Sequence, residues 1–189
     1  PCYADCFGCS QVFDDLECCQ TADGHNPWPF WCGLQVHNAA AAAGLAPKLL
    51  QHELLPGGST FVVMERLGPD WTLLTKVLKK SGSAQQQVTS AVRKAVQNFH
   101  ALRFQAAGRE GCMPVHGDLR PPNVMVKYDV EDGYTVNFID FDMSGIAGVD
   151  TYGVATSWRN RSISWHTDVE PGSLMQQAHD VHLLEDYFK

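Results

Sequence analysis

The chain has few basic residues and no long apolar run, and these absences exclude several classes of function. Lys and Arg together number 14 against 21 Asp and Glu, so the net charge is -7. Nucleic acids and anionic membranes bind proteins through clustered Lys and Arg, so neither is an expected partner. The longest nearly uncharged stretch, residues 36–50, is interrupted by Gly44 and Pro47 and is too short to span a bilayer. We therefore expect a soluble, cytoplasmic protein with no membrane segment.

Cysteine is nearly absent after the first 32 residues, which hold six of the seven cysteines. One hypothesis is a zinc site whose thiolates come from Cys2, Cys6 and Cys9, completed by Cys18, Cys19 or His25. Disulfides are a second possibility, which the odd count disfavours, and free thiols are a third. Residues 1–33 are therefore a cysteine-rich segment of unassigned structure. Because the chain begins at Pro1 rather than Met, a processed or partial sequence is expected.

From residue 34 onward, helix and strand signals follow one another, which predicts an α+β fold. The first expected helix covers the alanine-rich residues 34–43, with Gly44 as its C-terminal cap and Pro47 preventing its continuation. The later pattern predicts, in order, strands at 49–50 and 60–64, a helix over 71–80, a helix over 86–102, a hairpin of strands 124–127 and 135–139, a loop over 143–165 and a helix over 173–188.

Two of these helices have an apolar face that indicates how they pack. The helix over 86–102 carries one face made of Val88, Val92, Val96, Phe99 and Leu102. The helix over 173–188 is expected to bury Leu174, Ala178, Val181, Leu184 and Tyr187 or Phe188. We assign no chemical role to His100, which falls in the first of these helices.

The residues that can carry chemistry gather between positions 116 and 142. The run HGDLRPPN covers residues 116–123, and the run IDFD covers residues 139–142 at the end of an apolar strand. Because a hairpin folds the chain back, Asp140 is expected to lie near Asn123. Asp118 could then accept a proton from a hydroxyl, beside an amide and a carboxylate that can hold Mg²⁺ through oxygen. Phosphoryl transfer needs these parts, because its catalysis consists largely of positioning and charge neutralisation.

HGDLRPPN resembles the catalytic loop of the protein-kinase and aminoglycoside-phosphotransferase superfamily, and IDFD resembles its metal-binding motif. Together they are similar to the kinase-like domain proteins abundant in fungi. Gly117 replaces the arginine of protein kinases, as in the small-molecule branch, and Asp142 replaces the usual glycine. The resemblance extends to three further segments. Residues 44–50 are similar to the end of the family's αC helix and its next strand, and residues 62–67 are similar to the hinge strand between its lobes. The His179-Asp180 pair is similar to a pair whose aspartate braces the catalytic loop.

The resemblance implies a protein-kinase-like fold, with a truncated or degenerate N-terminal lobe over 34–67 and a mainly helical C-terminal lobe over 68–189. It also implies ATP and Mg²⁺ as cofactors and a hydroxyl acceptor, either protein Ser/Thr or a small molecule. The implied site residues are Asp118 as the catalytic aspartate, Arg120 near the transferring phosphate, Asn123 and Asp140 as Mg²⁺ ligands, and Met64, Glu65 and Leu67 around the adenine.

Two parts of the family pattern are missing from the chain. No glycine-rich loop and no lysine precede Lys48, and Gln35 stands where a glutamate would pair with that lysine. Either Lys48 or Arg66 substitutes for the lysine, or the N-terminal lobe has decayed. Two functions follow: a phosphotransferase, or a pseudokinase-like module that binds nucleotide or protein without turnover. A third is a zinc-stabilised interaction domain over residues 1–32.

Overall fold

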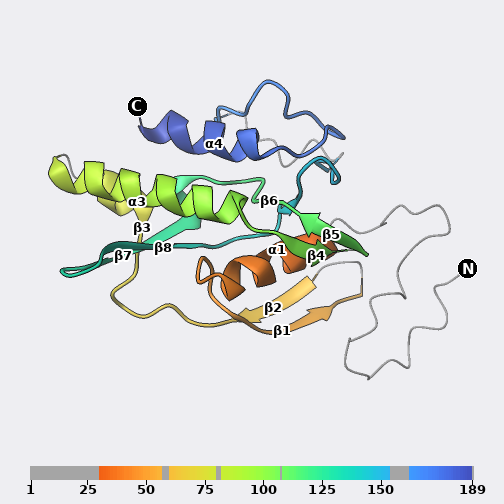
Figure 1. Cartoon of the computed structure of the whole chain (residues 1–189), viewed down its shortest axis with the longest axis horizontal. Coiled ribbons are helices and arrows are strands. Elements are labelled where there is room, and N and C mark those ends of the chain that lie inside the picture. Colours follow the sequence, from red (N-terminus) through yellow and green to blue (C-terminus); the bar gives the residue numbers. More distant parts are fainter. Residues whose placement is uncertain (1–29, 57–59, 80–81, 107, 154–161, 189) are drawn as a thin grey trace, which may run out of the picture.

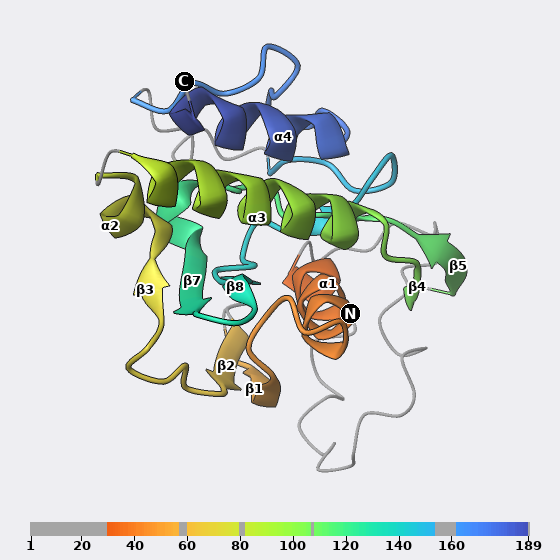
Figure 2. The same cartoon turned by 60° about the vertical axis from the view of Figure 1, so that its left-hand side comes forward.

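The computed structural model describes residues 30–56, 60–79, 82–106, 108–153 and 162–188. The cysteines of the zinc hypothesis lie outside these ranges. Figures 1 and 2 show the elements stacked in one direction, from α4 through α3 and the β7–β8 hairpin to α1 and the β1–β2 hairpin. This mixture of helix and sheet confirms the α+β prediction. In the described part of the chain, no helix is long and apolar enough to cross a membrane.

The first helix, α1, covers Phe30–Ala42 and so begins four residues before the expected start at residue 34. It ends as expected at Gly44, which has a φ of +73°. The Gly44 N–H donates to Ala41 O at 3.0 Å, and the Leu45 N–H donates to Ala40 O at 2.9 Å. These two bonds form a Schellman motif, which turns the chain toward the next strand.

The strands that follow α1 form an antiparallel hairpin. β1 covers Leu49–Leu54 and β2 covers Thr60–Met64, so the second strand agrees with its expected bounds and the first is longer. The Glu65 N–H extends the pairing by donating to Lys48 O at 2.8 Å. This hairpin lies at the end of the molecule opposite α4 (Figure 1).

The prediction of a helix over 71–80 is wrong for the first half of that range. Thr72–Leu73 forms the strand β3, and only Leu74–Leu78 forms the helix α2. β3 pairs with Val126 and Met125 of β7. The edge of the hairpin supplies backbone partners at this point, and this tertiary pairing overrides a weak helical pattern.

The longest helix, α3, covers Ser83–His100 and packs on the sheet β3–β7–β8. Its expected apolar face is buried, and Leu102 lies just beyond its end, partly buried against the same core. The hairpin strands β7, Val124–Asp129, and β8, Gly133–Phe138, confirm the expected pair. Phe99 of α3 meets Phe138 of β8 edge to face, with ring centroids 5.5 Å apart. The same core includes Val36 of α1.

Two short strand pairs were not expected from the sequence. β4, Phe104–Ala106, pairs with β5, Arg109–Cys112, and β6, Pro114–Val115, pairs with β9, Gly145–Ile146. β9 falls inside the stretch 143–165, which was expected to be loop. Pairs this short have no measurable period, so the sequence pattern does not reveal them.

The last helix, α4, covers Gln177–Glu185 and leads into a 3₁₀ turn, η5, at Asp186–Phe188. It begins four residues later than expected. Its expected face is correct at Leu184, which is buried, and at Phe188, which is partly buried against the same core, but wrong at the other positions. Leu174, Ala178 and Val181 are exposed. The buried side chains of α4 are His179, Asp180, Leu183 and Leu184. The two buried polar residues contact other parts of the chain, which compensates their loss of water.

Candidate functional site

Asp180 of α4 holds the start of the HGDLRPPN loop. Its fully buried carboxylate accepts hydrogen bonds from the backbone N–H of His116 at 2.8 Å and of Gly117 at 2.9 Å. His100 of α3 lies on the same carboxylate, with Nε2 3.0 Å from Oδ2. These contacts confirm the bracing role expected for Asp180 and place His100 in a structural role beside it.

Gly117 is required at its position for two physical reasons. Its φ is +81°, a conformation that side chains rarely adopt. A Cβ atom built there would lie 2.1 Å from the backbone oxygen of Met143 and 2.9 Å from the Cε of Met175. The backbone of the loop therefore packs directly against the segment that follows IDFD.

We predict that Gly117→Ala lowers the free energy of unfolding by about 3 kcal/mol or more, because strain at positive φ adds to a clash with backbone. Gly172→Ala is the matched control, since Gly172 has a φ of +82° and no other atom within 4 Å of a built Cβ. It should lose only about 1–2 kcal/mol. Urea unfolding of both variants measures the difference, and equal losses would contradict the role of the Met143 contact.

Three residues of the loop are bonded to one another. The Arg120 guanidinium donates to both carboxylate oxygens of Asp118, at 2.5 and 2.6 Å. The Asn123 Nδ2 donates to the backbone oxygen and to Oδ2 of Asp118, both at 2.9 Å. The hydrogen bond to Asp118 raises the pKa of Arg120, so this guanidinium is charged. Because its nitrogen is engaged, the amide of Asn123 has its oxygen left for a metal.

The hairpin brings Asp140 to this group, as the sequence predicted. The Ile139 N–H donates to Asn123 O at 3.0 Å, and the Nε2 of His116 lies 3.1 Å from Ile139 O. Asp140 itself has a φ of +66°, a conformation that aspartate tolerates better than most residues. Partial loss of its water shell and the nearby carboxylate of Asp142 raise the pKa of Asp140, with a further contribution from Asp118.

These donors fit Mg²⁺. The Asp140 and Asp142 carboxylates and the Asn123 amide offer oxygen, the ligand atom that Mg²⁺ prefers. Burial and, after it, the carboxylates of Asp142 and Asp118 raise the pKa of Asp140, and a divalent cation would stabilise the charged form of this carboxylate. The chemistry of these side chains thus matches the cofactor.

Phe141 connects the IDFD segment to α1 through ring contacts. Its ring stacks on His37 of α1, with centroids 4.5 Å apart, and lies 4.9 Å from the ring of His116. The Nε2 of His37 lies 2.8 Å from Pro47 O. Gly33 allows the close approach, because a Cβ there would lie 2.8 Å from Phe141 O. The sequence reasoning missed both His37 and Gly33, although a lone histidine among the apolar residues of a helix was a visible signal.

We predict that the chain loses stability as the pH falls below about 6.5. Burial lowers the pKa of His37 from its ordinary 6.5. Between the lowered value and 6.5, the unfolded chain binds a proton that the folded chain does not, so stability falls by up to about 1.4 kcal/mol per pH unit. His37→Gln, which keeps a donor for Pro47 O, should reduce this slope in urea unfolding. An equal slope in both chains would contradict the prediction.

The residues expected to hold adenine lie at the end of β2. Met64 and Leu67 are half-buried and Glu65 is exposed. The Glu65 N–H is already bonded to Lys48 O, so its carbonyl is the group left for a ligand. A hollow of about 180 Å³ lies nearby, lined by Gly33, Leu34, His37, Thr60, Val62, Phe141 and Asp142. None of the three residues expected to hold adenine lines this hollow, so the hollow does not connect those residues with the HGDLRPPN loop.

Within the described residues, the two expected substitutes for the lysine, Lys48 and Arg66, make no ion pair with α1. Gln35 is half-buried, and Lys48 and Arg66 are exposed. Among the residues that the structure describes, the ion pairs join Arg93 to Glu185, His100 to Asp180, Arg120 to Asp118, Lys127 to Asp70 and His166 to Asp168. The described structure therefore offers no counterpart of the lysine–glutamate clamp.

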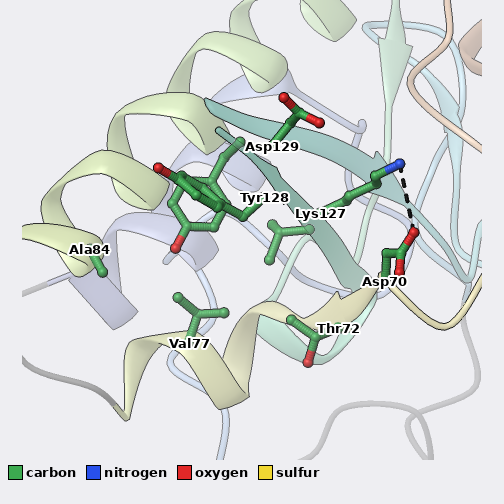
Figure 3. A pocket seen from close by; sticks show the side chains of 9 residues that line it. Asp70, Thr72, Val77, Ala84, Lys127, Tyr128 and Asp129 are labelled. Atoms are coloured by element: carbon green, nitrogen blue, oxygen red, sulfur yellow. Dashed lines mark ion pairs between the residues drawn. The ribbon is translucent and has the colours of Figure 1, made fainter. Parts of the chain in front are cut away.

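A larger hollow, of about 580 Å³, lies apart from these residues, between α2, the start of α3 and the hairpin (Figure 3). At one side Lys127 reaches Asp70, with Nζ 3.9 Å from Oδ2. Tyr128 and Tyr134 face each other across the strands, with ring centroids 5.0 Å apart. None of the expected site residues lines this hollow.

The fold is of the protein-kinase type: helix α3 is followed by the HGDLRPPN loop and the β7–β8 hairpin, and Asp180 of α4 holds the loop. The comparison that supports this is the structure of the Cydia pomonella granulovirus kinase PK-1, to which the chain is similar with a TM-score of 0.52 and 16% sequence identity. The match covers 78% of this chain and 49% of that kinase, so the chain spans about half of its length. No family model and no curated protein match the sequence. At this identity the likeness shows the fold alone.

Proposed function

We propose that the chain is a kinase-like phosphotransferase that uses ATP and Mg²⁺ to transfer the γ-phosphate to a hydroxyl. The observation that carries the proposal is the meeting of Asp118, Asn123 and Asp140 at the junction of loop and hairpin. Asn123 bonds to Asp118 directly, and Ile139, next to Asp140, bonds to the Asn123 backbone. A base and two oxygen donors at one point are the parts this chemistry needs.

Each side chain has a distinct task in this proposal. Asp118 orients the acceptor hydroxyl and takes its proton, for which one carboxylate oxygen must leave Arg120. Arg120 then has a charged guanidinium to turn toward the phosphate. Mg²⁺ held by Asn123 and Asp140 would neutralise negative charge on the phosphates when bound. The adenine would lie against Met64 and the backbone groups of Glu65 and Leu67.

A nucleotide-binding module without turnover is the second candidate. It is favoured by Gln35, which stands where the resemblance places the glutamate of the lysine–glutamate pair, since glutamine cannot form that ion pair. Loss of this clamp would remove several kcal/mol of transition-state stabilisation. In the first candidate function the phosphate acceptor is either protein Ser/Thr or a small molecule. The second candidate function has no acceptor.

Measuring Mg²⁺-ATP binding and ATP turnover together distinguishes the two candidates. The native chain should show a rise in melting temperature with Mg²⁺-ATP and measurable turnover. Asp118→Asn should keep the rise and reduce turnover about a hundredfold or more, since it removes the general base. Asp132→Asn, an exposed carboxylate near the hairpin turn, is the matched control and should match the native chain. A rise in melting temperature with equal background turnover in all three chains would support the second candidate.

A further inference from the structure

A second group of side chains able to bind a cation lies outside the catalytic loop, between α4 and the segment that precedes it. It consists of His166, Asp168 and His179, and one ligand atom from each lies within 4.8 Å of the others. His179 is buried, His166 is half-buried and Asp168 is exposed, so ions can reach the group from solvent on one side. Two imidazoles and a carboxylate from two segments of the chain are thus brought together.

The turn at residues 166–169 holds its two members side by side. The Val169 N–H donates to His166 O at 3.0 Å, and the Asp168 N–H donates to His166 Nδ1 at 3.2 Å. The Asp168 carboxylate lies 3.8 Å from the same nitrogen. Val169 is fully buried with Val115 and Tyr152, which anchors the turn to the rest of the molecule. The pair is therefore positioned before any ion binds.

His179 is oriented through one of its ring nitrogens. Its Nδ1 lies 3.0 Å from the Tyr152 hydroxyl and 3.3 Å from the backbone N–H of Gln176. These contacts leave Nε2 as the nitrogen that can meet a metal. When Nε2 binds, Nδ1 carries a proton and donates it to the Tyr152 oxygen, while the longer Gln176 contact is given up. A hydrogen bond from the second nitrogen of a metal-bound histidine is the usual support for such a ligand.

The protonation states suit this arrangement. Burial, followed by the neighbouring His166 ring, lowers the pKa of His179, so this imidazole is neutral at neutral pH, as a metal ligand must be. Burial also raises the pKa of Tyr152, so the phenol keeps its proton and its oxygen can accept a hydrogen bond. The arrangement of His166, Asp168 and His179 does not depend on these pKa shifts, and both shifts favour metal binding.

The ligand types indicate which metal fits. Imidazole with carboxylate favours Zn²⁺, Co²⁺ or Ni²⁺, whereas Mg²⁺ is held by oxygen. Zn²⁺ takes four ligands at about 2.0–2.2 Å, with water filling a place that the protein leaves open. The ligand atoms lie within 4.8 Å of one another, which is somewhat farther apart than such bonds allow, so the side chains must close on the ion, and Asp168 is the exposed one. An exposed side chain can do so at small cost.

We infer that His166, Asp168 and His179 form a binding site for a divalent transition metal of the Zn²⁺ class, with water as the fourth ligand. The ion ties the turn at 166–169 to α4. Because α4 also carries Asp180, which accepts bonds from the catalytic loop, metal binding stabilises the brace of that loop. The site is separate from the oxygen donors of Asn123 and Asp140.

A Co²⁺ titration of the full chain, after treatment with a chelator, tests the inference. The cysteines are first alkylated with iodoacetamide, because those of the N-terminal segment are alternative ligands. About one Co²⁺ per chain should bind in the presence of excess Mg²⁺ and raise the melting temperature. His166→Gln should weaken binding at least about tenfold, and Tyr152→Phe should weaken it about tenfold through the lost support.

Two further variants separate ligand loss from damage to the fold. Asp168 is exposed, so Asp168→Asn leaves the core intact and should still weaken Co²⁺ binding about tenfold or more. His52→Gln, on β1 of the other hairpin, should bind Co²⁺ as the native chain does. Absence of Co²⁺ binding by the alkylated native chain would overturn the inference, as would equal affinity in the native chain and in both ligand variants.

Discussion

Asp140→Asn is expected to reduce Mg²⁺-dependent ATP turnover by about a thousandfold or more. The change keeps one oxygen and removes the charge that holds the cation, which is worth about 4 kcal/mol or more of transition-state stabilisation. Turnover measured over a range of Mg²⁺ concentrations provides the test, with Asp132→Asn as the control for an exposed charge. Turnover that is unchanged in Asp140→Asn would contradict the metal-ligand role and, with it, the proposed chemistry.

The same substitution should leave the fold intact, so that a loss of activity cannot be attributed to unfolding. Asparagine tolerates the φ of +66° at this position as well as aspartate does. It also removes a partly buried charge that lies beside the carboxylates of Asp142 and Asp118. The melting temperature without nucleotide is therefore expected to stay the same or to rise slightly. A large fall would show that Asp140 has a structural role instead.

Asp180→Ala is expected to lower the free energy of unfolding by about 3–5 kcal/mol. It leaves the buried N–H groups of His116 and Gly117 without their acceptor and removes the partner of His100. Breaking a buried charged network from one side has a cost of this size. Urea unfolding measures the loss, and turnover should fall as well because the loop is released.

The matched control for Asp180 lies on the same helix. Glu185 forms an ion pair with Arg93, with both contact distances at 2.6 Å, but the two side chains are 40% and 49% exposed. Glu185→Ala should therefore lose only about 0.2–1 kcal/mol. If the two variants are destabilised equally, the buried carboxylate is not the brace described above. Asp180→Asn, which keeps the shape and one acceptor oxygen, should fall between the two.

Much of the site could be predicted because its order along the chain determines its geometry. An amphipathic helix, a loop and a hairpin can fold back in few ways, so Asp140 had to return to Asn123. The Arg120–Asp118 ion pair could not be foreseen, since residues two apart in a loop meet only if the backbone turns in a particular way. His37 was missed because its partners, Pro47 and Phe141, become neighbours only after folding.

The helices α3 and α4 show where pattern reading succeeds and where it fails. The apolar face of α3 was predicted correctly, because apolar side chains alone bury it. In α4 the buried residues include His179 and Asp180, which a search for apolar periodicity places on the outside. Burial there is decided by hydrogen bonds to the HGDLRPPN loop and to Tyr152. The resemblance to a kinase-type pair revealed Asp180, and the hydrophobic pattern did not.

The contact between Gly33 and Phe141 has a mechanical consequence. α1 touches the backbone of the IDFD segment without an intervening side chain, and His37 stacks on the ring of Phe141. A tilt of α1 would therefore displace Phe141, the residue next to Asp140. A contact that fixes the orientation of α1 would thus also affect the position of the Asp140 carboxylate, although the contact itself lies elsewhere on the helix.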